Sequence, residues 1–533
     1  MRNGLRHLAA GSMLLVGAAA CADLDVENPN DANAARALST AADVEALIAG
    51  AYNSWYSGNH SSAGAGPFLS NASFQHTAPW ANFGMEQYGR IPRIPIVNDV
   101  SDGQYTSFSR NFTFAYRAAA AVADGFRALA EDPEIAAELG EERVLRARAF
   151  GRFVQGLAHA QIAVLYNEGW LVDENTDVFN AGEPMGYAEL MNAALVLIDE
   201  SISLAIQGSF EIPFGWMQRE IDSDEFIRFA HSMKARYRAL NARTPAEREA
   251  VDWAAVIADV DAGITEDFVV FADNDAGWFS ALFFYPRPGW AEVPYYIWGM
   301  ADQSDNYQNW LALPLGSKHP IVNGVPTLII TPDQRFPRGE TLEEQQASPG
   351  LYFASPTDIF SVWAQPGRGT WRWSYYRHLK HFDYVTSGAV GDLPEITVRE
   401  MRLLKAEGLF RTGDVAGAAA IINETRVANG GLNPTNAAGA NTSCVPKLPN
   451  GQCGDLFEML KWEKRTETAM YGPITVGFYF DSRGWGDLYR GTPLQFPTPC
   501  EDVEILGRLP CTTFGGLEGE MASPGSTYAW PFE

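Results

Sequence analysis

A helical spacing of apolar residues runs through the first half of the chain. Thr40 and Asp43 form a capping box, and apolar side chains then recur from Val44 to Trp55 at the intervals of one helix face. Stripes of the same kind predict five further helices, over residues 108–129, 141–166, 187–204, 224–242 and 251–264. Because each helix has one apolar face to bury, we expect them to pack together as a scaffold.

The pattern returns near the C-terminus as a helical hairpin. Residues 395–410 predict one helix, with Pro394 suited to its first turn, and residues 415–427 predict a second. Asp414 lies in the tight turn between them, where it can cap the second helix. Ala-rich helices joined in this way are typical of tetratricopeptide-like hairpins, in which small residues let the two helices approach closely.

Two earlier pairs of predicted helices can form hairpins of the same kind, namely 141–166 with 187–204 and 224–242 with 251–264. No strict repeat of about 34 residues is visible. We therefore predict a mostly α fold, in which a tetratricopeptide-like helical-hairpin scaffold carries long irregular loop insertions.

The helical pattern breaks down over residues 265–393. Pro and Gly interrupt this segment and aromatic residues crowd into it, with one short strand predicted at Val325–Ile330. The alternation of Trp371, Trp373 and Tyr375 predicts a half-buried strand whose rings serve packing. An irregular run of this length is uncommon unless it packs on a scaffold and has a function, so we expect a loop-rich, ligand-binding insertion here.

The net negative charge of the chain argues against anionic partners. The chain carries 65 Asp and Glu against 39 Lys and Arg, which gives a formal net charge of -26. Negative charge in this excess repels phosphate backbones and anionic lipid surfaces, so we expect no nucleic-acid partner.

The N-terminus is typical of an exported lipoprotein. Residues 1–20 resemble a secretory signal peptide, in which Arg2 and Arg6 precede a short apolar run that ends in small residues. Cys21 follows directly, as in a bacterial lipobox, so we predict that cleavage leaves an acylated Cys21 on an acidic tether, residues 21–38. The alternative is a soluble signal peptide with an incidental cysteine. No later apolar run of about 18 residues is visible, so lipid on Cys21 is the expected anchor.

Four further cysteines lie in two close pairs near the C-terminus: Cys444, Cys453, Cys500 and Cys511. Four cysteines permit three pairings. Short loops cost the least entropy to close, which favours Cys444–Cys453 and Cys500–Cys511, each stabilising its loop by about 2–3 kcal/mol. The alternative, four reduced thiols, suits an exported chain less well.

Four blocks of sequence resemble the SusD/RagB family of outer-membrane nutrient-binding lipoproteins. The blocks are Cys21 through Asn28-Pro29-Asn30 to the helix at 40–52, then residues 402–413, residues 418–432, and Trp462–Arg465 followed by Arg483–Gly491. No single block is specific, but they follow the family's order and span nearly the whole chain. Residues 473–482 interrupt the last block and the second cysteine pair is unusual for the family, so the resemblance says least about the C-terminal geometry.

The resemblance implies a single SusD-like domain over residues 39–533. Its helical scaffold comprises residues 39–264 and 394–472, and disulfides close the C-terminal region, residues 473–533. It further implies a lipid-anchored protein of the outer membrane, exposed at the cell surface, with a SusC-like TonB-dependent transporter as partner. Ligands in the family are typically oligosaccharides and sometimes peptides. We therefore expect a binding protein without enzymatic activity, cofactor or metal.

Two loop segments, residues 76–90 and 290–310, offer the chemistry that a sugar ligand requires. Aromatic rings stack on the C–H faces of pyranose rings, while Asn, Asp, Gln and Arg side chains bond the hydroxyl groups. The resemblance places the ligand at loops from the same two regions. We predict ligand contacts from Trp80, Asn82, Tyr296, Trp298 and Asp302. The alternative is that these side chains pack beneath long loops.

A secreted glycoside hydrolase and a purely structural adaptor remain the other function classes. Glu463, Arg465, Asp487 and Arg490 combine carboxylates with cations, but the family uses this block structurally, so we predict a buried polar network. Gly-x-Ser-x-Gly, a P-loop and His-Glu-x-x-His are all missing from the sequence, and its eight scattered His do not suggest zinc.

Overall fold

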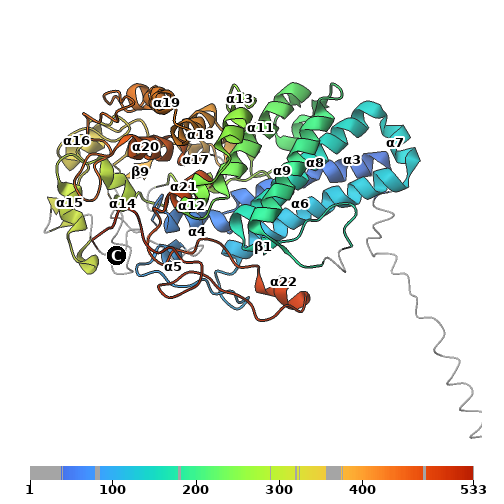
Figure 1. Cartoon of the computed structure of the whole chain (residues 1–533), viewed down its shortest axis with the longest axis horizontal. Coiled ribbons are helices and arrows are strands. Elements are labelled where there is room, and N and C mark those ends of the chain that lie inside the picture. Colours follow the sequence, from blue (N-terminus) through green and yellow to red (C-terminus); the bar gives the residue numbers. More distant parts are fainter. Residues whose placement is uncertain are drawn as a thin grey trace, which may run out of the picture.

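The computed structural model describes residues 40–77, 85–177, 182–287, 290–318, 325–355, 376–471 and 476–531, together with residues 38, 321, 322 and 374. Helices account for most of its regular structure (Figure 1). The longer helices are α3 (Ala41–His60), α4 (Ala65–Ala72), α6 (Thr106–Glu131), α8 (Glu141–Leu165), α9 (Tyr187–Ala205), α11 (Ser223–Leu240), α13 (Trp253–Asp261), α18 (Val398–Arg411), α19 (Val415–Ala428), α20 (Leu456–Thr468) and α21 (Val476–Trp485).

Short helices and two-stranded sheets connect these elements. The short helices are α5 (Met85–Gly89), α7 (Pro133–Leu139), α10 (Phe214–Met217), α12 (Pro245–Glu249), α14 (Tyr295–Trp298), α15 (Asn306–Leu311), α16 (Leu342–Ala347), α17 (Phe382–Thr386) and α22 (Cys500–Ile505). The strands pair antiparallel as β1 (Glu168–Gly169) with β2 (Met185–Gly186), β3 (Glu211–Ile212) with β4 (Ile221–Asp222), β5 (Phe268–Asp273) with β10 (Val390–Ile396), β6 (Ile321–Val322) with β7 (Val325–Pro326), and β8 (Phe353–Ala354) with β9 (Arg377–His378).

The long helices pack as successive hairpins along one side of the molecule. Helix α3 packs on α6, α6 on α8, α8 on α9, α9 on α11, α11 on α13, and α13 on α18, which in turn packs on α19 and α20 (Figure 1). The three predicted hairpins correspond to α8/α9, α11/α13 and α18/α19. The mostly α, hairpin-based fold predicted from periodicity is therefore confirmed.

Capping side chains begin the helices where the sequence suggests. The hydroxyl oxygen of Thr40 accepts a hydrogen bond from the backbone N–H of Asp43 at the start of α3. The carboxylate of Asp414 accepts one from the N–H of Gly417 at 2.9 Å, at the start of α19. Each cap satisfies a backbone donor that the first turn of a helix leaves unpaired.

One predicted helix begins later than expected. The sequence predicts Pro394 in the first turn of a helix over 395–410. In the structure Pro394 lies in β10, opposite Val269 of β5, and α18 begins at Val398 after the cap Thr397. The strand pairing satisfies the backbone here, so the helix begins only where the ladder ends. The β5–β10 pair also joins the two ends of the loop-rich insertion. The strand predicted at Val325–Ile330 is shorter, since only β7 is paired there.

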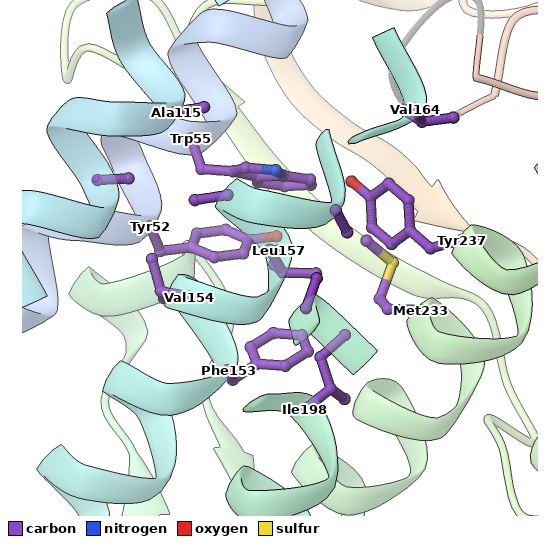
Figure 2. Close-up of a cluster of buried hydrophobic side chains, with 14 of the residues drawn as sticks. Tyr52, Trp55, Ala115, Phe153, Val154, Leu157, Val164, Ile198, Met233 and Tyr237 are labelled. Atoms are coloured by element: carbon purple, nitrogen blue, oxygen red, sulfur yellow. The ribbon is translucent and has the colours of Figure 1, made fainter. Parts of the chain in front are cut away.

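The main core lies between the hairpins (Figure 2). Tyr52 and Trp55 of α3 meet Phe153 and Leu157 of α8, with Tyr237 of α11 closing the cluster, and all five side chains are buried. Apolar burial on this scale is the dominant stabilising term for the scaffold.

A second core lies under the insertion. Most of its buried rings come from the insertion, from α20 and α21, and from the chain after α21: Tyr296, Trp298, Trp310, Phe336, Phe353, Trp462, Phe478, Tyr489, Tyr528 and Trp530. Aromatic residues that crowd the irregular part of the sequence thus mostly fill a core, and the short helices α14–α17 carry much of the segment.

The block around Glu463 is a buried polar network, as predicted. The Arg465 guanidinium lies 2.5 Å from the Asp487 carboxylate, and Arg335 lies 2.7 Å from Glu463, with all four side chains almost fully buried. Arg490, in contrast, is exposed at the surface. The buried carboxylates are enclosed by cations rather than open to a substrate, so their arrangement is structural.

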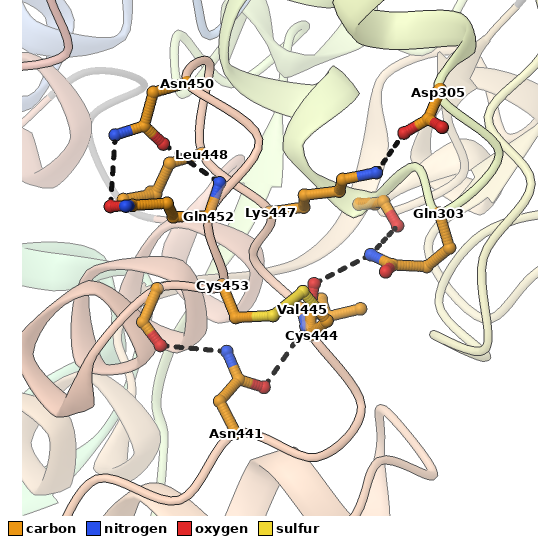
Figure 3. Close-up of a disulfide and its surroundings, with 12 residues drawn as sticks. Gln303, Asp305, Asn441, Cys444, Val445, Lys447, Leu448, Asn450, Gln452 and Cys453 are labelled. Atoms are coloured by element: carbon orange, nitrogen blue, oxygen red, sulfur yellow. Dashed lines mark hydrogen bonds and ion pairs between the residues drawn. A yellow bond between two sulfur atoms is a disulfide. The ribbon is translucent and has the colours of Figure 1, made fainter.

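Both predicted disulfides form. Cys444–Cys453 and Cys500–Cys511 close loops with sequence separations of 9 and 11. Around Cys444, the side-chain amide of Gln303 donates a hydrogen bond to the Cys444 carbonyl oxygen at 2.7 Å, and Lys447 forms an ion pair with Asp305 (Figure 3). The first disulfide loop therefore supports the part of the insertion that precedes α15.

Among the helices that the structure describes, none has both the length and the apolar character of a membrane span.

Candidate ligand-binding site

The structure brings the two predicted loop segments together. The backbone N–H of Thr77 donates to the carbonyl oxygen of Glu292 and the N–H of Glu292 donates to that of Thr77, both at 2.8 Å. The next residue, Val293, donates to Tyr376 and accepts from Ser374, both at 3.0 Å. Three segments that are far apart in the sequence thus meet at one place.

Two predicted site residues lie outside the described part of the chain. Trp80 and Asn82 follow Thr77, and their contribution to a site stays a prediction. Trp371, Trp373 and Tyr375 also lie outside the described residues, so the half-buried strand expected there stays a prediction.

The predicted contacts from Tyr296 and Trp298 need correction, because both rings are completely buried. Tyr296 stacks on Phe74 with ring centroids 4.4 Å apart, and Trp298 meets Phe353 edge to face at 5.0 Å. The Trp298 indole N–H donates to the carbonyl oxygen of Gln75 at 3.0 Å. A ring without exposed surface cannot stack on a sugar, so both rings hold the segments together from below.

Asp302 also has a structural role. Its carboxylate accepts hydrogen bonds from the backbone N–H groups of Ile330, at 2.8 Å, and Tyr307, at 3.1 Å, and from the Ser304 hydroxyl at 2.7 Å. Asp302 is 0% exposed. These bonds fix the turn before α15, and because the carboxylate is buried it cannot contact a ligand in this conformation.

A group of aromatic rings that keep some exposure lies just before Glu292. Phe279, Phe283, Phe284, Arg287 and Trp290, here called the Trp290 cluster, are all half-buried. Phe284 and Trp290 stack at 4.5 Å with an interplanar angle of 22°. The Arg287 guanidinium carbon lies 3.9 Å from the centroid of the Phe283 ring.

The scaffold positions this cluster through Ser280. His60, the last residue of α3, contacts the Ser280 hydroxyl through Nδ1 at 3.0 Å and the Glu395 carboxylate through Nε2 at 2.9 Å. The Ser280 hydroxyl oxygen accepts from the N–H of Leu282 and so caps the single 3-10 turn Ala281–Phe283. The cap therefore fixes the backbone of the turn that carries Phe283 and leads into Phe284.

Buried histidines lie beneath the meeting point of the three segments. The rings of His76 and His378 are 4.9 Å apart and fully buried. Burial lowers the pKa of His76 to about 3, and burial together with the neighbouring His76 lowers the pKa of His378 well below its ordinary value. Both rings are neutral at neutral pH.

A smaller hollow lies further along the insertion. Its volume is about 190 Å³, and its lining includes Asn306, Asn309 and Trp310. This volume is below the range of roughly 300–1,000 Å³ that is usual for small-molecule sites. Asn306 and Trp310 belong to the predicted second segment, so the hollow could extend a site but not form one alone.

The described residues include one group of potential metal ligands, Cys500, Glu504 and Cys511. The two sulfur atoms are joined in a disulfide and so cannot act as thiolate ligands.

The Trp290 cluster combines ring faces with a planar guanidinium, the mixture that recognises a sugar ring and its hydroxyl groups. Trp290 lies in a predicted segment, but Phe284 and Arg287 were not selected by sequence reasoning. No signal in the sequence separates Phe284 from Tyr285, which follows it directly and is buried.

Helical hairpins define the class as a helical-repeat protein, in which a loop insertion carries the aromatic cluster. No protein-family model matches the sequence, and no curated protein does. Solved structures do match. A SusD superfamily protein from Bacteroides thetaiotaomicron is 10% identical with a TM-score of 0.55, covering 89% of this chain and 99% of its own.

Two other solved structures agree. A SusD superfamily protein from Bacteroides vulgatus is 12% identical with a TM-score of 0.54, covering 88% of this chain and 97% of its own. A SusD-like carbohydrate binding protein from Bacteroides fragilis is 13% identical with a TM-score of 0.51, and the match covers 93% of this chain and 97% of that protein. The chain has the SusD fold, which confirms at the level of structure the resemblance noted in the sequence.

Proposed function

We propose that this protein is a lipid-anchored protein of the outer membrane that captures an oligosaccharide and delivers it, without cleaving it, to a SusC-like TonB-dependent transporter. The observation that carries the proposal is the half-buried Trp290–Phe284 stack beside Arg287, at the point where three loop segments meet. The shared fold supports it, since one structure with this fold is described as a carbohydrate binding protein.

Trp80 and Asn82 remain part of the proposed site. Both follow Thr77, whose backbone is paired with Glu292, two residues after Trp290. A ligand stacked on Trp290 would therefore lie close to the start of the segment that carries them.

Binding measurements on a panel of soluble oligosaccharides test the site. Replacing Trp290→Ala removes one face of the stack and should weaken binding by about 1–2 kcal/mol, roughly 5- to 30-fold in Kd. Phe214→Ala is the matched control, because Phe214 is 47% exposed on α10, outside the cluster. Equal affinity of Trp290→Ala and the unchanged protein would refute this placement of the ligand.

Two further assays, with peptides and with chromogenic glycosides, separate the alternatives. Binding of casein-derived peptides in place of oligosaccharides would indicate a peptide-binding member. Turnover of chromogenic glycosides would refute the claim of capture without cleavage.

The anchor has its own test. Cys21→Ser should abolish incorporation of labelled palmitate and move the protein from the membrane fraction to the soluble fraction. Membrane retention of that variant without label would contradict the lipid anchor and leave the binding site untouched.

A further inference from the structure

The segment around α22 carries an unusual concentration of exposed apolar side chains. Ile505 is 82% exposed, Leu509 60%, Val100 55%, and Leu506 and Val97 42% each. We call these five residues the α22 face. Most exposed apolar residues in a soluble protein occur singly, whereas a group of this kind usually marks an interaction surface.

Hydrogen bonds hold the two segments of the α22 face together. The Asn98 side-chain amide donates to the carbonyl oxygens of Thr498, at 3.0 Å, and Thr512, at 2.9 Å. Its oxygen accepts from the N–H of Cys500 at 3.0 Å. Cys500 is also bonded to Cys511, so the segment that carries Ile505 and Leu509 is closed at its base. The face is therefore pre-organised and would lose little conformational entropy on binding.

An apolar groove continues the face. A hollow of about 370 Å³ lies between α6, the segment after β1, and α22, and its lining includes Phe112, Tyr116, Trp170, Val172 and Leu506. Leu506 belongs to both the groove and the α22 face. An apolar side chain of a partner can enter the groove while Ile505 and Leu509 contact its surroundings, as in the anchor pockets of protein interfaces.

Charge indicates what covers this surface. Glu501 and Glu504 are exposed on α22, Asp502 lines the groove, and Asp99 is exposed between Val97 and Val100. Arg508 is already paired with Glu183. The acidic rim would repel a second copy of this chain and the phosphates of a lipid surface, and it favours a protein surface rimmed with Lys and Arg.

The distance between the α22 face and the proposed anchor decides whether the face can lie near the membrane. Groove residues Phe112 and Thr113 lie in α6, and Gly125 of the same helix packs against Ile48 of α3. Thirteen helical residues span about 20 Å, so the groove lies about 20 Å along α6 from the contact with Ile48, in the first half of α3. The tether of residues 21–38 can extend to about 60 Å. Figure 1 shows α22 at the edge of the molecule opposite to α18 and α19.

We propose that the α22 face, with its groove, is the surface through which this protein docks on an integral outer-membrane protein that presents apolar side chains within a basic rim. This inference rests on the proposed anchoring in the outer membrane and on delivery to a transporter there. It assigns that partner to α22 and the loop at 95–100, a part of the chain that ligand capture at the Trp290 cluster does not use.

Site-specific photo-crosslinking in cells that produce the full chain tests the proposal. Benzoylphenylalanine is placed at Ile505 or Leu509. The control positions are Ile206, which directly follows α9, and Val196 on α9, 69% and 55% exposed. The expected result is a crosslink from positions 505 and 509 to an outer-membrane β-barrel protein, identified by mass spectrometry. The yield at the control positions should be at least about tenfold lower, since partners contact only the docking face.

Variants at the rim provide a second measurement. Glu501→Lys together with Glu504→Lys should lower the crosslink yield at position 505 several-fold, because the partner's rim is expected to be basic. Crosslinks only to lipid, only to a second copy of the chain, equally from control positions, or none at all would each overturn the proposal.

Oligosaccharide affinity distinguishes this failure from failure of the proposed function. Purified Ile505→Asp and Leu509→Asp proteins should bind oligosaccharide as the unchanged protein does, because the altered side chains are exposed and outside the Trp290 cluster. If positions 505 and 509 give no crosslink to an outer-membrane protein while the purified protein binds oligosaccharide, only the docking surface is refuted. Crosslinking without sugar binding would refute only the ligand.

Discussion

Arg335 joins the insertion to the scaffold through a completely buried guanidinium. It pairs with Asp333 at 2.7 Å, with Glu463 at 2.7 Å and with Glu467 at 3.1 Å, and it donates to the Thr466 hydroxyl at 2.7 Å. None of the charged side chains has exposed surface. We predict that Arg335→Met, which keeps most of the side-chain volume, strongly destabilises the protein.

The magnitude follows from the charges that remain. Removing one partner of a buried ion pair typically costs about 3–5 kcal/mol, because the remaining charge cannot reach water. Arg335 faces three carboxylates, of which Glu467 is also paired with Arg399 at 2.9 Å. We therefore expect a loss of at least about 3 kcal/mol, although Asp333 and Glu463 can reduce it by taking up protons.

The pH dependence identifies the cause. Burial already raises the pKa of Glu463 in the folded protein, and loss of Arg335 should raise it further. A carboxyl group whose folded pKa lies above its unfolded value contributes stability below that unfolded value, and this contribution is lost as pH rises through the folded pKa. The deficit of Arg335→Met should therefore be larger at pH 8 than at pH 5.

Urea denaturation at both pH values, followed by tryptophan fluorescence, measures the effect. Arg402→Met is the control, because Arg402 pairs with Glu424 while both side chains are about half exposed, 40% and 46%. An exposed pair contributes only about 0–1 kcal/mol. A loss below about 1 kcal/mol for Arg335→Met, or the same loss at both pH values, would refute the reasoning.

The remaining predictions concern acid and reduction. In His159, Nδ1 contacts the Gln155 carbonyl oxygen at 2.7 Å and Nε2 contacts the Val172 N–H at 2.8 Å, an arrangement that requires the neutral ring, and burial lowers its pKa to about 4. The stability present above pH 6.5 should therefore be lost as pH falls towards 4, by up to about 1.4 kcal/mol per pH unit, and His159→Gln should reduce this slope in pH-dependent urea titrations; an unchanged slope would contradict the assignment. Replacing Cys500→Ser and Cys511→Ser together should lower the free energy of unfolding by about 2–3 kcal/mol, as expected for a loop with a sequence separation of 11. The measurement compares this variant with the unchanged protein under non-reducing conditions. An effect near zero would mean that the loop is ordered equally well without its disulfide.

The sequence by itself determined the scaffold. Helices α3, α6, α8, α9, α11 and α13 each have an apolar stripe with a period of about 3.6 residues, and packing against neighbouring helices buries these stripes. The pairing of both disulfides could also be predicted locally. Closing a loop of about ten residues costs little entropy, whatever the fold of distant parts of the chain. Caps such as Thr40 and Asp414 act within a single turn for the same reason.

Only the tertiary structure decided which loop aromatics form the core and which remain exposed. Tyr296 and Trp298 have the same chemistry as Trp290, and their neighbours in the sequence do not separate them. Tyr296 is buried because Trp530, more than 200 residues later, packs against it with ring centroids 6.1 Å apart, and Trp298 because Trp462 and Phe478 cover it. Pro394 shows the same dependence in the backbone, since β5, rather than its own neighbours, holds it in a strand. Burial is a property of everything that surrounds a side chain, and the surroundings of an irregular segment come from remote parts of the chain.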